Sequence, residues 1–221
     1  MSSQLIINAR LAGVHSPQGP LRGAALSGLP CIDDGWLLVE DEQIAELGDM
    51  KDLPKTLTKH SAIDAAGRWL LPAWCDSHTH LVYAGSREME FVDKIRGLSY
   101  AEINARGGGI LNSARVLRET SEDALFDQAW KRVQELGRLG TASIEIKSGY
   151  GLTVDGELKM LRVIKKLKQR CRHSIKASFL GAHTYPPEYR DDHPGYIDLI
   201  INARLAGVHS PQGPLRGAAL S

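Results

Sequence analysis

Short alternating or apolar runs, separated by glycine, proline and aspartate, dominate the first 67 residues. The runs have the length and composition of β-strands, and they lie at residues 5–7, 36–39 and 44–47. An Asp-Asp-Gly turn signal precedes the second run, and Leu-Gly-Asp closes the third. The pattern predicts a small β domain over residues 1–67.

The pattern changes at residue 68. Residues 69–75 form a nearly continuous apolar run, which is typical of a strand buried on both faces of a parallel sheet. Helical and strand patterns then alternate: a helix capped by Ser121 and ending near residue 139, a strand at 141–148, a helix at about 155–169 and a strand at 175–181. This β, α, β, α, β order predicts a parallel sheet with crossover helices over residues 68–198.

One repeat changes the interpretation of the whole chain. Residues 5–27 recur without a single difference as residues 199–221. Repeats of solenoids and propellers share only some positions and recur at short spacings, whereas this block is identical and occurs at the two ends alone. We therefore interpret residues 199–221 as a graft or a joining artefact, not as the natural continuation of the preceding segment.

Composition excludes several function classes. With 27 basic and 26 acidic residues among 221, the chain has no charge excess that would attract nucleic acid or an anionic membrane. Neither a secretory signal pattern nor an apolar stretch of about 18 residues is present, so we expect a cytoplasmic protein without a membrane partner. Cys31, Cys75 and Cys171 are odd in number and far apart, which predicts buried free thiols instead of disulfides or a thiolate zinc site.

The candidate chemistry follows the apolar run that starts at residue 69. His78 and His80 are two residues apart, and residues with that spacing share a face of a strand, so both imidazoles can bind one divalent ion. Asp76 shares the face and has two possible roles: a carboxylate that orients a histidine ligand, or an ordinary strand-end hydrogen bond. Parallel α/β folds build their sites at the carboxyl ends of strands, where this segment is expected to lie.

The segment around the histidine pair resembles the amidohydrolase superfamily, and later motifs narrow the resemblance to the imidazolonepropionase family. The matching stretches are HTHLVYAGSR at 78–87, GLSYAEI at 97–103, ARGGGI at 105–110, IEIKSGYGL at 144–152, ELKML at 157–161 and FLGAH at 179–183. The resemblance covers residues 5 to about 199. It implies the first part of a metal-dependent hydrolase (β/α)8 barrel, incomplete here at about three βα units, with a small β-sandwich domain formed by the N-terminal segment.

The resemblance also implies an activity and the residues that carry it. Members of that family hydrolyse 4-imidazolone-5-propanoate to N-formimidoyl-L-glutamate in histidine degradation with one zinc or iron ion, and the resemblance is compatible with a homodimer for the intact enzyme. His78 and His80 match metal ligands. Arg87, Tyr150 and His183 match substrate-binding residues.

Three further residues or segments are weaker candidates. Tyr100 matches a substrate contact, but a tyrosine on the apolar stripe of a helix is more often a core residue. The glycines at 107–109 precede a helix and offer backbone N–H groups to a carboxylate, or they simply shape a loop. Lys147 is expected to be an ordinary lysine near the site, not a modified lysine that bridges two metal ions.

The chain is too short for the complete site that the resemblance implies. A catalytic zinc site normally has at least three protein ligands, and a full barrel needs about 250 residues. The family's remaining ligands and acid/base groups are expected beyond residue 198, so no catalytic acid or base is assigned. Three hypotheses follow: an imidazolonepropionase present in part and inactive as written, another amidohydrolase such as a deaminase or a dihydroorotase-like enzyme, or a non-enzymatic truncated remnant.

Overall fold

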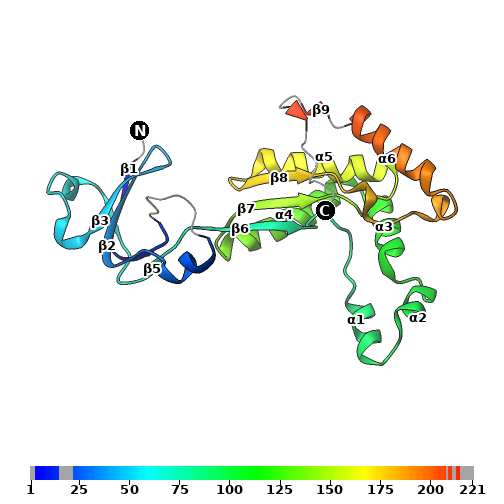
Figure 1. The fold of residues 1–221 in the computed structure, drawn as a ribbon, viewed down its shortest axis with the longest axis horizontal. Coiled ribbons are helices and arrows are strands. Elements are labelled where there is room, and N and C mark those ends of the chain that lie inside the picture. Colours follow the sequence, from blue (N-terminus) through cyan, green and yellow to red (C-terminus); the bar gives the residue numbers. More distant parts are fainter. Residues whose placement is uncertain (1–2, 15–21, 208, 211–212, 215–221) are drawn as a thin grey trace. The chain divides into compact units, whose positions relative to one another are not determined.

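A computed structural model describes residues 3–14, 22–207, 209–210 and 213–214 of the protein (Figure 1). The chain divides into two compact units, residues 1–72 and residues 73–221, and each is described by itself. The rest of both copies of the repeat, residues 15–21, 208, 211–212 and 215–221, lies outside the described residues.

The first unit is built around one sheet. Its strands are β1 (Ser3–Ala12), β2 (Cys31–Glu40), β3 (Gln43–Asp49), β4 (Ala62–Asp64) and β5 (Trp69–Leu70). Their order is β3-β2-β1-β4, and β5 also pairs with β1. β1 runs antiparallel to β2 but parallel to β4 and β5. Short 3-10 helices at Gly23–Gly28, Met50–Asp52 and Leu57–Lys59 connect the strands. The strands predicted at 5–7, 36–39 and 44–47 are therefore confirmed as parts of β1, β2 and β3.

β1 lies inside this sheet and contributes to small apolar clusters. Leu5 packs with Trp36 and Leu38, while Ala9 and Leu11 pack with Leu37. All of these side chains are at most 4% exposed. The segment thus forms a strand because β2 and β4 take up its backbone hydrogen bonds while its apolar side chains are buried.

The prediction of one buried strand over residues 69–75 is wrong. The run is divided between β5, which ends at Leu70 in the first unit, and β6 (Trp74–Thr79) in the second. Trp69 is 52% exposed and Trp74 is 62% exposed, so the run is not buried on both faces. The physical reason is position, because β6 is an edge strand of its sheet and, within the described residues, the short β5 pairs only with β1.

The second unit contains a three-stranded parallel sheet in the order β6-β7-β8 (Figure 1). Its remaining elements are α1 (Glu88–Ile95), α2 (Tyr100–Ala105), α3 (Gly109–Glu119), α4 (Glu122–Arg138), β7 (Thr141–Lys147), α5 (Val154–Arg170), β8 (Ser174–Ser178), α6 (His193–Gly207), β9 (His209–Ser210) and β10 (Gly213–Pro214). 3-10 helices lie at Gly181–His183 and Pro187–Tyr189. The predicted alternation is confirmed, although β8 ends three residues earlier than expected.

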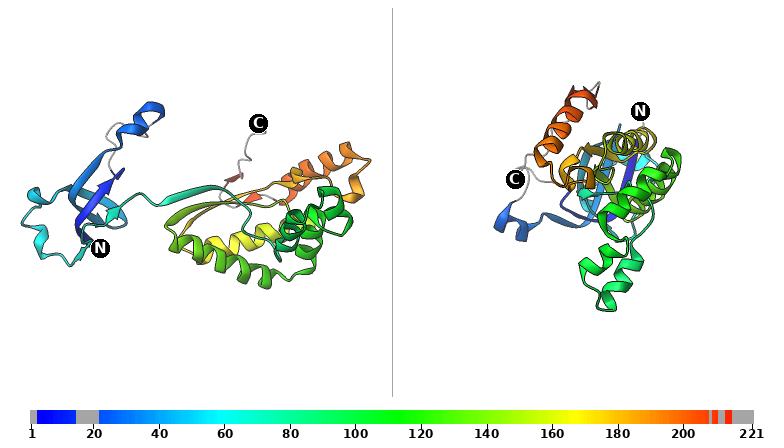
Figure 2. Two further views of the ribbon diagram at one scale, coloured as in Figure 1. Left: turned by 90° about the horizontal axis from the view of Figure 1, so that it is seen from below. Right: turned by 90° about the vertical axis from the view of Figure 1, so that its right-hand side faces the viewer.

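α4 and α5 cover the same face of this sheet (Figure 2). Ile144 and Ile146 point from β7 into the core with Val133 of α4 and Ile164 of α5, each at most 1% exposed. Because side chains alternate along a strand, Glu145 and Lys147 lie on the opposite face. The helices therefore bury one face of β7 and leave polar groups on the other.

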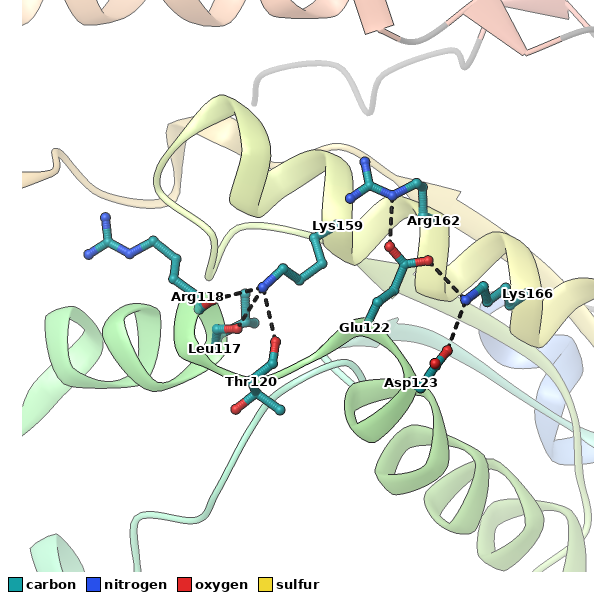
Figure 3. A network of polar contacts seen from close by, with 8 residues as sticks. All are labelled: Leu117, Arg118, Thr120, Glu122, Asp123, Lys159, Arg162 and Lys166. Carbon is teal, nitrogen blue, oxygen red and sulfur yellow. Dashed lines mark hydrogen bonds and ion pairs between the residues drawn. The ribbon is translucent and has the colours of Figure 1, made fainter.

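Polar contacts hold α5 against the ends of α3 and α4 (Figure 3). The Lys159 ammonium donates to the carbonyls of Arg118 at 2.8 Å, Thr120 at 3.0 Å and Leu117 at 3.4 Å, which lie at the carboxyl end of α3. Glu122 at the start of α4 accepts from Arg162 of α5 at 2.8 Å. A lysine at a helix carboxyl end satisfies carbonyls that the helix itself leaves without partners.

The second copy of the repeat folds differently from the first. Residues 199–207 continue α6, whereas the same nine residues at 5–13 contain most of β1. Ile197 and Ile201 on α6 are 49% and 51% exposed. The identical sequence is thus a buried strand in one unit and a partly exposed helix in the other.

Two general predictions have mixed outcomes. The cysteines are free, as predicted, but Cys31 and Cys75 are exposed and only Cys171 is half-buried, so burial was predicted wrongly for the first two. Cys31 is the first residue of β2 and Cys75 is the second residue of β6, so both lie near the starts of their strands. Within the described residues, no helix has the length and apolarity needed to cross a membrane.

Candidate functional site at the ends of three parallel strands

Four rings from three strand ends form a cluster in the second unit. His78 belongs to β6, and His80 is the first residue after that strand. Tyr150 lies in the loop after β7, and His183 lies in the 3-10 helix after β8. Parallel strands end at the same edge of a sheet, which is why residues 105 positions apart meet here. We call His78, His80, Tyr150 and His183 the ring cluster.

His80 is the centre of the ring cluster. Its ring centroid lies 5.8 Å from that of His78, 5.0 Å from that of Tyr150 and 5.0 Å from that of His183. The planes of His80 and His183 are 8° apart, so these rings are stacked, and Tyr150 meets His183 edge-on at 5.1 Å. The structure therefore brings four of the six predicted site residues together.

The electrostatic environment keeps His80 neutral. Burial is the main cause that lowers the pKa of His80 to about 4, and the neighbouring His183, His78 and Lys147 lower it further. His80 Nδ1 is buried and has no hydrogen-bond partner among the described residues. A neutral imidazole with an unused buried nitrogen has the properties that a metal ion requires of a histidine ligand.

Asp76 has the less specific of its two predicted roles. Its Oδ1 accepts from the backbone N–H of His78 at 3.3 Å, which is a strand-end hydrogen bond and not a contact with an imidazole N–H. Among the described residues, no group of three or more histidine, cysteine, aspartate or glutamate side chains could hold a metal ion.

Arg87 and Tyr100 lie outside the ring cluster, in the helical segment after β6. Arg87 precedes α1, and its Nε donates to Oε2 of Glu90 at 2.9 Å. The hydrogen bond with Glu90 is the main cause that raises the pKa of Arg87, with smaller contributions from Tyr150 and Tyr100. Tyr100 is 59% exposed, so the alternative reading of Tyr100 as a core residue is wrong.

Glu90 connects this segment to the glycines at 107–109. The backbone N–H of Gly109 donates to Oε1 of Glu90 at 2.8 Å, and Oε2 of the same carboxylate accepts from Arg87. The N–H group at the start of α3 thus donates to a carboxylate, but this carboxylate is the Glu90 side chain and not that of a ligand. Glu90 thereby joins the start of α3 to the arginine that precedes α1.

Two acidic residues at the site were not predicted from the sequence. Glu145 accepts from Lys147 at 2.6 Å, and the charge of each acts on His80. Lys147 is thus ion-paired with Glu145. Glu157 of α5 is 5% exposed and binds the loop that carries Tyr150. The two-residue spacing of Glu145 and Lys147 on β7 was a usable signal, and Glu157 begins the ELKML stretch that carries the resemblance, although that stretch does not show the role of its carboxylate.

Comparison with known proteins supports the resemblance predicted from the motifs. No family model matches the chain. Among curated proteins, it is 54% identical to the imidazolonepropionase of Christiangramia forsetii and 57% identical to that of Flavobacterium johnsoniae, each over 186 residues, 84% of this chain and 45% of the relative. The resemblance to imidazolonepropionases is thereby confirmed, and the chain spans about half the length of the curated relatives it matches.

Solved structures give the fold at lower identity. The chain matches 5-methylcytosine deaminase from Klebsiella pneumoniae with a TM-score of 0.59 at 19% identity, covering 92% of this chain and 42% of that one. It matches E. coli guanine deaminase with a TM-score of 0.54 at 15% identity, covering 81% and 37%. The chain therefore shares a mixed α/β fold with these two deaminases.

Proposed function

We propose that this chain carries about half of an imidazolonepropionase, an enzyme that hydrolyses 4-imidazolone-5-propanoate to N-formimidoyl-L-glutamate in histidine degradation. The observation that carries the proposal is the ring cluster, which joins His78 and His80 to Tyr150 and His183 at one edge of the sheet. The identity of 54–57% to imidazolonepropionases supports this reaction over others of the same fold.

The fold proposal follows from the same partial match. We take β6, β7 and β8 with their helices as the first three or so units of a (β/α)8 barrel, and the first unit as part of a small β-sandwich. The parallel order of the strands supports this assignment. The remaining ligands and the acid/base groups would then come from the part of the relatives that this chain does not match.

The residues present fit a metal ion in part. His78 and His80 would hold it, since His80 is neutral and its buried Nδ1 has no partner among the described residues. When bound, one zinc or iron ion supplies the Lewis acidity that activates water and polarises a carbonyl. Two imidazoles are fewer than the three protein ligands of a usual catalytic zinc site, so the affinity of this chain should be weak.

The substrate side is assigned to Arg87, Tyr150 and His183, with Tyr100 as a weaker contact. A guanidinium has five N–H donors, so the pairing of Arg87 with one oxygen of Glu90 leaves donors for the propionate carboxylate. Tyr150 and His183 would contact the imidazolone ring across the ring cluster. Glu90 would keep the Arg87 fork oriented while the carboxylate binds.

Metal titration and turnover of the purified 221-residue chain test this proposal. We expect weak zinc binding that His80→Ala removes, no measurable turnover of 4-imidazolone-5-propanoate, and no effect of the exposed control Cys31→Ser. Tight stoichiometric metal with turnover by the chain alone would contradict the partial-site proposal. Turnover of a deaminase or dihydroorotase substrate instead would favour another amidohydrolase.

Resequencing the DNA beyond the codon for Ile200 separates two hypotheses: a gene whose sequence is incomplete, and a gene that encodes a truncated remnant. A long in-frame extension that encodes further histidines and aspartates would remove the remnant hypothesis. A confirmed repeat followed by a stop codon would instead show that the partial site is all that this gene encodes.

A further inference from the structure

A buried carboxylate lies beneath the loop that connects β7 to α5. Oε2 of Glu157 accepts from the backbone N–H of Gly149 at 2.8 Å, and Oε1 accepts from Gly151 at 2.7 Å and Leu152 at 3.1 Å. The Glu157 side chain belongs to α5 and is 5% exposed, so it has been taken out of water to make these bonds. Both of its oxygens face donors, which a carboxylate satisfies and a primary amide does not.

The loop is fixed against α5 by close packing as well. A Cβ at Gly151 would lie 2.3 Å from the backbone nitrogen of Glu157, which leaves no room for any side chain. Gly149 has a φ of +112°, a conformation that favours glycine, and a Cβ there would lie 3.0 Å from Nδ1 of His183. Tyr150 is held between these two glycines, so its backbone position follows from theirs.

The same loop determines the protonation pattern of His183. Nδ1 of His183 lies 2.9 Å from the carbonyl oxygen of Gly149. A carbonyl oxygen can only accept, so Nδ1 must carry the proton, and in the neutral ring Nε2 then bears the lone pair. The ring is also stacked on His80, which fixes its plane.

We propose that Glu157 is a positioning residue for the ring cluster. Its carboxylate fixes residues 149–152 through three backbone N–H groups, and Gly149 in turn keeps His183 as the Nδ1–H tautomer, while Tyr150 keeps its edge-on contact. The catalytic relevance of this role rests on the proposed function. It means that the Nε2 lone pair of His183 is preset to accept a proton or an N–H group from a small polar heterocycle.

Nitrogen-resolved NMR of the histidine rings in the full 221-residue chain tests this inference. At about pH 8, where an ordinary histidine is neutral, and with a chelator present, we expect His183 to be almost wholly the Nδ1–H tautomer. In Glu157→Gln it should become a mixture with the Nε2–H form, and the amide signals of Gly149 and Gly151 should shift. The matched control Glu122→Gln removes a carboxylate that binds Arg162 and Lys166 of α5 instead of the loop, and it should change neither readout.

Defined outcomes would overturn the inference. A folded Glu157→Gln chain with an unchanged His183 tautomer would do so. That result would show that the Glu157 carboxylate does not control the tautomer. If that variant does not fold, the unaltered chain still decides: an Nε2–H tautomer or fast exchange of the Gly149 amide contradicts the proposal. Neither readout needs substrate or metal, so failure here is distinct from failure of the proposed hydrolase activity.

Discussion

Residues 5–13 and residues 199–207 are the same nine amino acids, yet the first copy is mostly strand β1 and the second is the end of helix α6. In the first copy, Leu5 is 1% exposed and packs on Trp36. In the second, the equivalent Leu199 is half-buried beside a small cavity of about 30 Å³ that Tyr196 also lines. The difference shows how neighbouring segments decide the structure of an ambiguous apolar sequence.

Different partners act on the two copies. β1 has β2 on one side and β4 on the other, so a strand satisfies its backbone groups. The second copy begins inside a helix that starts earlier, at His193. At that start, Oδ1 of Asp192 accepts from the N–H of Gly195 at 3.0 Å, so residues outside the repeat begin the helix. Once a first turn exists, each added residue gains a hydrogen bond, so the helix extends into the copied sequence.

The largest expected effect is the cost of truncating the equivalent leucines. Leu5→Ala should lower the free energy of unfolding of the first unit by about 3 kcal/mol, because it removes a fully buried side chain. Leu199→Ala should cost less than about 1 kcal/mol, since that site is only half-buried. Denaturant unfolding with hydrogen-exchange readout per unit measures both, and equal costs would contradict the contrast.

A second test compares two contributions to the stability of the second unit: the contacts between α5 and the end of α3, and the second copy of the repeat. Lys159→Met keeps the aliphatic stem but removes three carbonyl contacts, and it should cost about 2 kcal/mol of unfolding free energy in the second unit. Lys165→Met on the exposed side of the same helix is the control and should be nearly neutral. Deleting residues 199–221 should cost less than Lys159→Met, and the reverse ranking would mean that the second copy stabilises the site.

Equivalent asparagines should respond to one substitution with opposite signs. Asn8 has a φ of +54° and donates to Asp64 at 3.0 Å, so Asn8→Ala should cost about 1–2 kcal/mol. Asn202 is an exposed residue of α6, where alanine should stabilise the helix by about 0.5 kcal/mol. Thermal unfolding of both variants checks the signs, and a stabilising Asn8→Ala would refute the strand assignment of the first copy.

The smallest expected effect separates the two units by pH. The folded-state pKa of His80 is lowered from 6.5 to about 4, so the unfolded chain binds the proton more readily between these values. The free energy of unfolding of the second unit should therefore fall as pH drops from 6.5 to about 4, by about 1 kcal/mol or less after allowance for solvent screening.

His80→Asn supplies the control for that pH effect. In the metal-free chain this variant should flatten the pH dependence of the second unit, and amide exchange of β1 in the first unit should not follow it. A slope that His80→Asn leaves unchanged would assign the effect to other groups.

Local signals in the sequence predicted helices α4 and α5 well. Ser121 was assigned as a cap, and its hydroxyl accepts from the N–H of Ala124 at 3.2 Å at the start of α4. The start of α5 was placed at Asp155, one residue late, because Thr153 caps it by accepting from Gly156 at 3.1 Å. Capping and helical periodicity act over a few positions, so they can be read without the fold, whereas the turn signals at 33–35 and 47–49 lie inside β2 and β3.

Features that depend on distant partners were missed. The apolar run at 69–75 predicts one buried strand, but only the sheet order shows that Trp74 lies on an edge. The ELKML stretch contains Glu157 but does not show its role, which arises where the loop after β7 meets α5. The histidines were found because their spacing of two carries the chemistry, whereas their meeting with Tyr150 needed the parallel sheet.

The central proposal is that residues 1–198 carry about half of an imidazolonepropionase site. Its most direct test is a chimera in which these residues are followed by the remaining part of the Flavobacterium johnsoniae imidazolonepropionase. We predict turnover of 4-imidazolone-5-propanoate by the metal-loaded chimera, loss of turnover in its His80→Ala variant, and none in the 221-residue chain. A folded, metal-loaded chimera that does not hydrolyse this substrate would contradict the account.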